Sequence, residues 1–180
     1  MIMLKNDIAR KNGIARMAAA AALSLALMSA TPAGAEEKPL ATFKVMTPKT
    51  ALALAQATLE ACRKGGYQVA VVVTDRFGSV QVALRDRLAG AHTVETARRK
   101  AWSAVSFRTN TWEMYGLIKD GTVNPGVRQI GQALFVGGGV RVTAAGSIVG
   151  GVGVSGAPGG KLDHDCAVEG IEAIQDILEF

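Results

Sequence analysis

The sequence predicts an α+β fold, in which helices pack against a mainly antiparallel sheet. Segments with strand patterns follow one another across short turns, and segments with helical patterns fall in separate blocks. A doubly wound nucleotide-binding fold would instead alternate strands and helices along the whole chain. The expected order is helix, two strands, helix, a short helix, three strands and a final helix.

The first helix is expected over residues 48–64. Thr47 is a suitable N-cap, Pro48 suits the first helical position, and Gly65 ends the pattern. Apolar residues recur along it at helical spacing: Leu52, Ala55, Leu59 and Cys62.

A β-hairpin should follow this helix. Residues 67–74 are β-branched and almost wholly apolar, as in a buried strand, and residues 75–78 form a tight turn. Residues 79–85 alternate between apolar and polar side chains, which predicts the returning strand.

The second helix is expected over residues 91–107, followed by a short helix over 111–118 and a loop over 119–126. One face of the second helix is a stripe of small apolar residues. Its other face carries polar residues: His92, Thr96, Arg99 and Ser103. This polar face is a candidate site.

The third part of the chain is rich in glycine. Strands are expected over 132–136, 140–143 and 147–154, and Asp163 should cap a last helix that runs to about residue 178. The glycine spacing does not fit the G-x-G-x-x-G dinucleotide motif, and there is no Walker A lysine. Glycines within strands more often indicate bulges, tight packing or close approach of another backbone or a ligand.

The amino-terminal segment has the pattern of a secretory signal. Four basic residues precede an apolar run over residues 17–30, and Ala33-Gly34-Ala35 matches an A-x-A cleavage site. The apolar run of about 14 residues is shorter than the roughly 20 that a transmembrane helix needs. We expect cleavage after Ala35, a flexible arm over residues 36–46, a domain over 47–180, and a periplasmic or secreted location.

The charge balance argues against a nucleic-acid partner. The leader holds four of the 20 basic and one of the 15 acidic residues, so the mature part keeps 16 and 14. Such a balance is typical of an ordinary solvated surface. Nor do we expect stable membrane insertion once the signal has been removed.

The two cysteines, Cys62 and Cys166, each lie in an expected helix beside alanine. We therefore expect two buried free thiols. A disulfide is the alternative, because an exported protein can oxidise its cysteines.

Two histidines could contact a metal, and no H-x-x-x-H or C-x-x-C spacing indicates a closed zinc site. His92 begins a helix that carries cations one or two turns later, and these could hold a carboxylate while the imidazole binds a metal. His164, between two aspartates, is a weaker candidate, since a solvated first helical turn explains it equally well.

Four ordered motifs resemble one family. Residues 71–78 resemble its V-V-D-x-x-G hairpin, and residues 90–104 its G-A…A-x-x-K-A-x-T-A helix. Residues 137–156 resemble its G-G-x-P…G-x-x-V-G-A-I-G-V-S-G segment, although the proline is missing, and residues 163–170 its D-x-x-C-A-x-x-G helix start. The chain is similar over residues 47–178 to the GlcG/HbpS-like family, which includes the C-terminal domain of PduO-type corrinoid adenosyltransferases.

The resemblance implies a profilin-like or PAS-like α-β-α sandwich with a central antiparallel sheet of about five strands. It also implies a homo-oligomer, haem as the cofactor, and a role in haem degradation, iron capture or redox sensing. We expect His92 to be the axial contact, Arg99 and Lys100 to hold propionates, and Thr93 or Thr96 to support them.

Two other functions stay open. One is a small-molecule isomerase or lyase, or an accessory to organic-acid oxidation of the glycolate type, with Asp75, Arg85 and Lys100 in a pocket. The other is a non-catalytic extracellular sensor partner.

Overall fold

The computed structural model describes residues 39–179, so the expected signal, its cleavage site and the first residues of the arm lie outside the described part. The helices and strands follow the predicted order closely. They are α2 (Pro48–Lys64), β1 (Ala70–Asp75), β2 (Val80–Arg85), α3 (Thr93–Ser106), α4 (Thr111–Lys119), the 3-10 helix η1 (Pro125–Gln129), β3 (Gly139–Ala144), β4 (Ser147–Ser155), α5 (Gly160–Glu172) and α6 (Gln175–Leu178).

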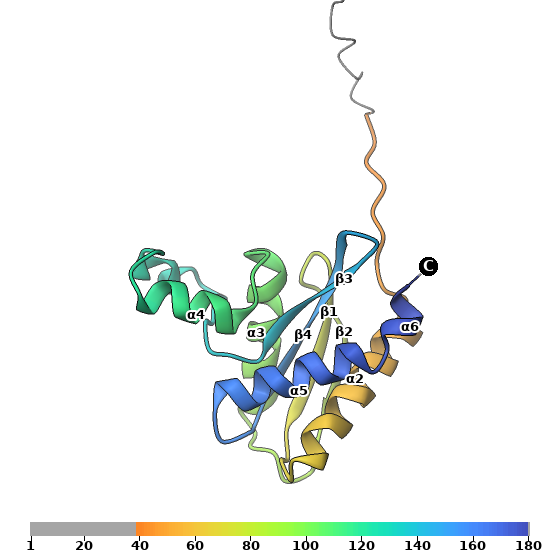
Figure 1. Cartoon of the computed structure of the whole chain (residues 1–180), viewed down its shortest axis with the longest axis horizontal. Coiled ribbons are helices and arrows are strands. Elements are labelled where there is room, and N and C mark those ends of the chain that lie inside the picture. Colours follow the sequence, from red (N-terminus) through yellow and green to blue (C-terminus); the bar gives the residue numbers. More distant parts are fainter. Residues whose placement is uncertain (1–38, 180) are drawn as a thin grey trace, which may run out of the picture. The chain divides into compact units, whose positions relative to one another are not determined.

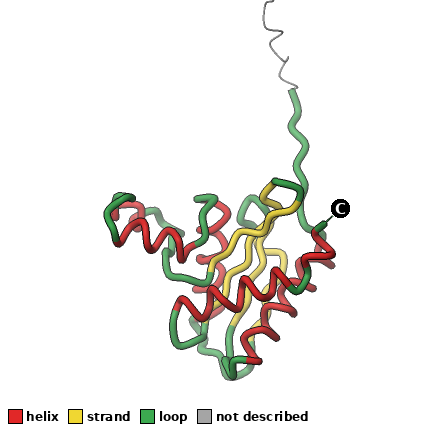
Figure 2. The backbone as a smooth tube through the Cα atoms, in the orientation of Figure 1, coloured by secondary structure: helices red, strands yellow, loops and turns green. Residues whose placement is uncertain are grey.

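The strands form one antiparallel sheet in the order β2-β1-β4-β3 (Figures 1 and 2). Val71 of β1 pairs with Leu84 of β2 on one side and with Val154 of β4 on the other. β1 and β4 are therefore the central strands. Ser155 at the end of β4 pairs with Ala70 at the start of β1. The segment after Ser155 therefore begins at the same end of the sheet as β1.

The predicted strand over residues 132–136 is absent, so the sheet has four strands instead of about five. Side chains form hydrogen bonds with backbone N–H and C=O groups of this segment. Ser103 Oγ accepts the N–H of Leu134, and Arg99 donates to the carbonyl of Ala133. Since these partners come from α3, the segment lies along the helix and not in the sheet.

Helices cover both faces of the sheet (Figure 1). Val71 and Val73 of β1 belong to the core cluster that includes residues of α2 and α5, whereas Ala70 and Val72 pack with Ala97 of α3. This is the two-sided arrangement that the family resemblance implied. Within α2 the buried stripe includes Ala51 and Leu54, and Leu52, which the pattern placed in the stripe, is exposed.

Glycines allow α3 to lie close to the sheet. A Cβ on Gly153 would fall 2.8 Å from the backbone N of Ala101, and one on Gly151 would fall 2.7 Å from Val105. A Cβ on Gly139 would fall 2.6 Å from the backbone carbonyl carbon of Lys100. The expectation of tight packing at these glycines is confirmed. This packing brings the backbone of Lys100 close to the sheet.

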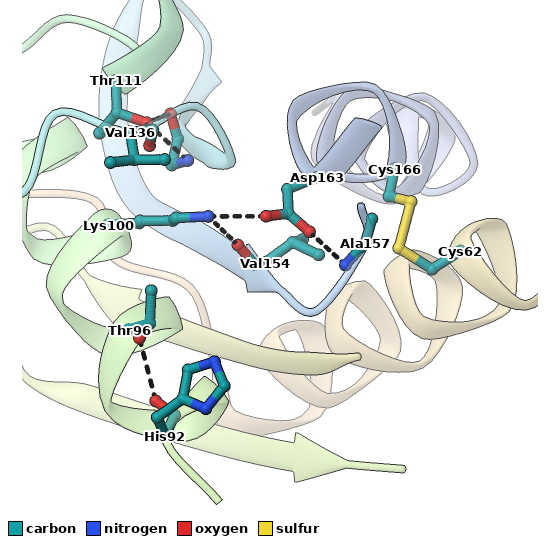
Figure 3. A network of polar contacts seen from close by, with 11 residues as sticks. Cys62, His92, Thr96, Lys100, Thr111, Val136, Val154, Ala157, Asp163 and Cys166 are labelled. Atoms are coloured by element: carbon teal, nitrogen blue, oxygen red, sulfur yellow. Dashed lines mark hydrogen bonds and ion pairs between the residues drawn. A yellow bond between two sulfur atoms is a disulfide. The ribbon is translucent and has the colours of Figure 1, made fainter. Parts of the chain in front are cut away.

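The expectation of free thiols is wrong, because Cys62 of α2 and Cys166 of α5 form a disulfide (Figure 3). Their Cα atoms are 5.2 Å apart, within the usual range for a disulfide. Helical spacing correctly predicted that both cysteines are buried. It could not show that α2 and α5 pack side by side with these two positions facing each other.

The last helix differs from expectation in its ends. It begins at Gly160 with Gly159 as N-cap, so Asp163 lies in the first turn and is buried. It ends at Glu172, and the expected continuation to residue 178 is the separate short helix α6.

Part of the expected arm contacts the domain: Met46 is buried, and its carbonyl accepts a hydrogen bond from Gln81. Within residues 39–179, no helix has both the length and the apolar character needed to cross a membrane.

Candidate functional site

A cleft of about 620 Å³ lies at the amino-terminal end of α3. We call it the α3 cleft. Leu88, Gly90 and the first turns of α3 form one part of its wall, and the segment 155–160 between β4 and α5 forms another. Lys100 and Asp163 line its buried part. The volume is in the range of small-molecule and cofactor sites.

Lys100 and Asp163 form a buried ion pair (Figure 3). Lys100 Nζ donates to Asp163 Oδ2 at 2.7 Å and to the carbonyl oxygen of Val154 at 2.9 Å. The other carboxylate oxygen, Oδ1, accepts the N–H of Ala157 at 3.0 Å. The pair therefore joins α3, the end of β4 and α5, and it holds one wall of the cleft in place.

Burial moves the two pKa values towards each other. Desolvation lowers the pKa of Lys100, and the charge and hydrogen bond of Asp163 oppose this only in part. Desolvation also raises the pKa of Asp163, against the opposing effects of Lys100 and of the N–H groups of Ala157 and Gly156. An ion pair and a neutral pair that shares the same proton are therefore closer in free energy here than in water.

His92, Thr93 and Thr96 lie along the wall of the cleft. His92 is exposed at the N-cap position of α3, and its side chain makes no capping hydrogen bond. The two threonine hydroxyls are already engaged: Thr93 donates to the carbonyl of Gly90 at 2.7 Å, and Thr96 to that of His92 at 3.0 Å. The threonine oxygens still carry acceptor lone pairs, whereas the imidazole is exposed and makes no capping hydrogen bond.

Arg99 and His164 lie elsewhere. The Arg99 guanidinium is on the same face of α3 as His92 and Thr96, but it donates to the carbonyls of Gln132 and Ala133 and does not line the cleft. His164 is half-buried, and its Nδ1 finds no hydrogen-bond partner within residues 39–179. Desolvation lowers the pKa of His164. The structure thus brings together His92, Thr93, Thr96 and Lys100 and leaves out the other two.

The residues expected to join Lys100 in an enzyme site do not do so. Asp75 Oδ1 accepts the N–H groups of Phe77 and Ser79 and so holds the β1–β2 turn. Arg85 donates to the carbonyl of Ala89. Both contacts stabilise the hairpin and the chain entering α3, whereas Lys100 is in a cleft as that hypothesis required.

Sequence reasoning missed Asp163 and the segment 155–160. The position of Asp163 near a helix start predicts a cap, and nothing in the sequence links it to Lys100 on another helix. Its place in the motif with Cys166 was the available signal. Among residues 39–179, no group of three or more His, Cys, Asp or Glu side chains is arranged to hold a metal ion.

Comparison with known proteins assigns the chain to a family. The model described as "Haem degrading protein HbpS-like" matches residues 46–172. The corrinoid adenosyltransferase PduO of Salmonella typhimurium strain LT2 is 31% identical over 123 residues, which are 67% of this chain and 36% of PduO. The chain therefore spans about a third of the length of that curated relative.

Solved structures agree with this assignment. A crystal structure of a double mutant of HbpS from Streptomyces reticuli is 37% identical, with a TM-score of 0.71, covering 81% of this chain and 98% of that one. A crystal structure of a PduOC–haem complex is 28% identical, with a TM-score of 0.65, covering 72% and 95% of the two chains.

Proposed function

The chain belongs to the family of haem-degrading, HbpS-like proteins, and from this premise we propose that it binds haem in the α3 cleft, with His92 as the axial contact. The observation that carries the proposal is the placement of His92. Its imidazole is exposed on the wall of the cleft and makes no capping hydrogen bond, and neutral imidazole is a common ligand of haem iron.

The relatives support the same ligand class. PduOC, which shares the fold at 28% identity, was crystallised with haem. The volume of the cleft, about 620 Å³, and its lining of both apolar and polar residues also suit a large amphipathic ligand.

The structure modifies the expected propionate contacts. Arg99 is held by backbone carbonyls outside the cleft, and Lys100 is held by Asp163. The carboxylates of a ligand would instead meet the amino end of α5, whose first residue Gly160 lines the cleft. Unpaired N–H groups at a helix start attract anions. Bound haem would supply the iron centre, while this chain would orient it and exclude water.

The proposal is tested by titrating haemin into the mature protein, residues 36–180, and following the Soret band. We expect a saturable shift for the unmodified protein and for His164→Ala, which changes the histidine outside the cleft. His92→Ala should bind haemin more weakly and with an altered Soret band. Equal binding by His92→Ala and His164→Ala would contradict the assignment of His92.

The same titration separates binding from degradation. If the protein only binds haem, the Soret band of the complex stays constant when a mild reductant and oxygen are added. If it degrades haem, the band decays and chelatable iron appears. A constant band would assign haem binding alone to this chain, and a decaying band would assign degradation as well.

We also propose that the protein is exported and works in the periplasm or outside the cell. The signal pattern before Ala35 and the Cys62–Cys166 disulfide both support this, since disulfides persist in oxidising compartments. Expression of the full chain in a bacterial host should yield a periplasmic product that begins at Glu36. A cytoplasmic product that keeps residues 1–35 would contradict the proposal.

A further inference from the structure

The α3 cleft contains a group that haem binding does not use, the amine of Lys100. Among residues 39–179 the Lys100 side chain is the largest that is fully buried, with 1% of its surface exposed. Lysine is seldom fully buried unless it is paired. The position therefore calls for a role beyond filling space.

The hydrogen bonds that the amine makes use two of its three N–H donors. An ammonium group has three N–H donors, and Asp163 and Val154 accept two of them. Gly138 has no side chain that could crowd Nζ, whereas a Cβ at that position would lie 3.0 Å from Nζ. Gly138 has a φ of +119°, a conformation that other residues seldom adopt.

Asp163 is placed to take a proton from this amine. Its Oδ2 lies 2.7 Å from Lys100 Nζ, and its carboxylate is itself held by the N–H of Ala157. Desolvation activates lysine as a nucleophile towards carbonyl groups, and a carboxylate within hydrogen-bond distance can receive the proton that the amine must lose.

We propose that Lys100 forms a reversible imine with small 2-oxo acids that enter the α3 cleft. The carbonyl carbon would lie at Lys100, and the carboxylate would lie towards the amino end of α5, where Gly159 and Gly160 line the cleft. The proposal goes beyond haem binding and does not depend on it.

The reaction balances without any further reagent. One proton passes from Lys100 to Asp163, and the neutral amine turns its lone pair to the carbonyl carbon. A C–N bond forms, and the carbonyl oxygen takes one proton from the nitrogen and one back from Asp163 and leaves as water. The resulting C=N bond keeps the third proton on nitrogen, so the product is a protonated imine. Addition of water reverses each step. The imine withdraws electrons from the adjacent carbon, which suits proton abstraction or loss of a carboxylate there.

The experiment is reductive trapping on the full mature protein with no haem present. Pyruvate is added with cyanoborohydride, which reduces an imine to a stable secondary amine, and the product is digested and mapped by mass spectrometry. We expect one adduct per chain, located at Lys100. An adduct spread over exposed lysines, or no adduct, would overturn the proposal.

Two variants sharpen the result. Lys100→Arg keeps a cation for Asp163 but cannot form the imine, so it should lose the adduct. Lys119→Arg changes an exposed lysine at the end of α4 and should keep it. If Lys100→Arg does not fold, the peptide map of the unmodified protein still decides the question. Because no haem is used, this outcome and that of the haemin titration are independent.

Discussion

The buried ion pair of Lys100 and Asp163 shows how single residues shape the site. Burial disfavours the charged form of each, as the lowered pKa of Lys100 and the raised pKa of Asp163 show. Their mutual attraction and the backbone partners Val154 and Ala157 offset that desolvation. A pair of this kind is weak evidence for stability, but removing one partner leaves an uncompensated charge.

Removing one member of the pair should therefore cost more than removing both. We expect Lys100→Met to reduce the free energy of unfolding by about 3–5 kcal/mol, and the double variant with Asp163→Leu to recover most of that loss. Urea unfolding of both single variants and the double variant checks this. Losses that simply add in the double variant would show that the two groups do not interact.

A second residue, His164, should make stability depend on pH. Desolvation lowers its pKa in the folded protein below the usual 6.5. The unfolded chain therefore binds the proton more tightly, so the contribution is present above pH 6.5 and is lost as the pH falls towards the folded-state pKa. Between pH 7.5 and 5 we expect the urea midpoint to fall less for His164→Gln than for the unmodified protein. An identical pH dependence in His164→Gln and the unmodified protein would mean that burial does not affect this imidazole.

At the scale of the elements, the packing of α3 on β3 and β4 positions the site. Three residues of this helix, Thr93, Thr96 and Lys100, line the cleft together with its N-cap His92. Glycines beneath the helix bring its backbone close to the sheet.

The sequence predicted the helix and its polar face, of which His92 and Thr96 line the cleft. Arg99 and Ser103 of the same face bind the segment 132–136 instead. The sequence also predicted that the strand glycines serve close packing.

Other elements could not be predicted from local pattern. The segment 132–136 has the composition of a strand, yet its backbone groups are taken by Ser103, Arg99 and Thr111 from two helices. The contact of Lys100 with Asp163 joins positions far apart in sequence, and neither residue's neighbours indicate the other. Partners that come from separate elements are fixed by the tertiary fold.

Because α3 lies close to the sheet, adding one methyl group to a strand glycine beneath it should lower the stability of the protein. A Cβ at Gly153 would meet the backbone of Ala97 and Ala101, which cannot move aside as a side chain can. We expect Gly153→Ala to destabilise the protein by roughly 1–3 kcal/mol. Gly116→Ala is the matched control, since α4 has open space there and alanine favours a helix. Equal melting temperatures for the two variants would contradict this packing.

At the scale of the whole molecule, the disulfide links the first and the last long helices of the domain. Cys62 and Cys166 are 104 residues apart in sequence, so their bond ties α2 to α5, which also carries Asp163. The oligomer that the family resemblance implies stays a prediction, which light scattering on the mature protein would test.

The length of the closed loop sets the size of the expected effect. We expect the Cys62→Ala/Cys166→Ala variant to lose roughly 4–5 kcal/mol in the free energy of unfolding, through the larger entropy of its unfolded chain. Urea unfolding of the oxidised protein and the double variant measures this. An unchanged free energy would mean that the bond does not constrain the unfolded state.

The central claim is that the α3 cleft is the haem site and that His92 is the residue that contacts the iron. A crystal structure of the mature protein with haemin tests it most directly, because it locates the iron. The account predicts haem in the cleft, with iron bonded to a ring nitrogen of His92 and carboxylates near the start of α5. Haem bound to His164, or to a surface outside the cleft, would contradict it.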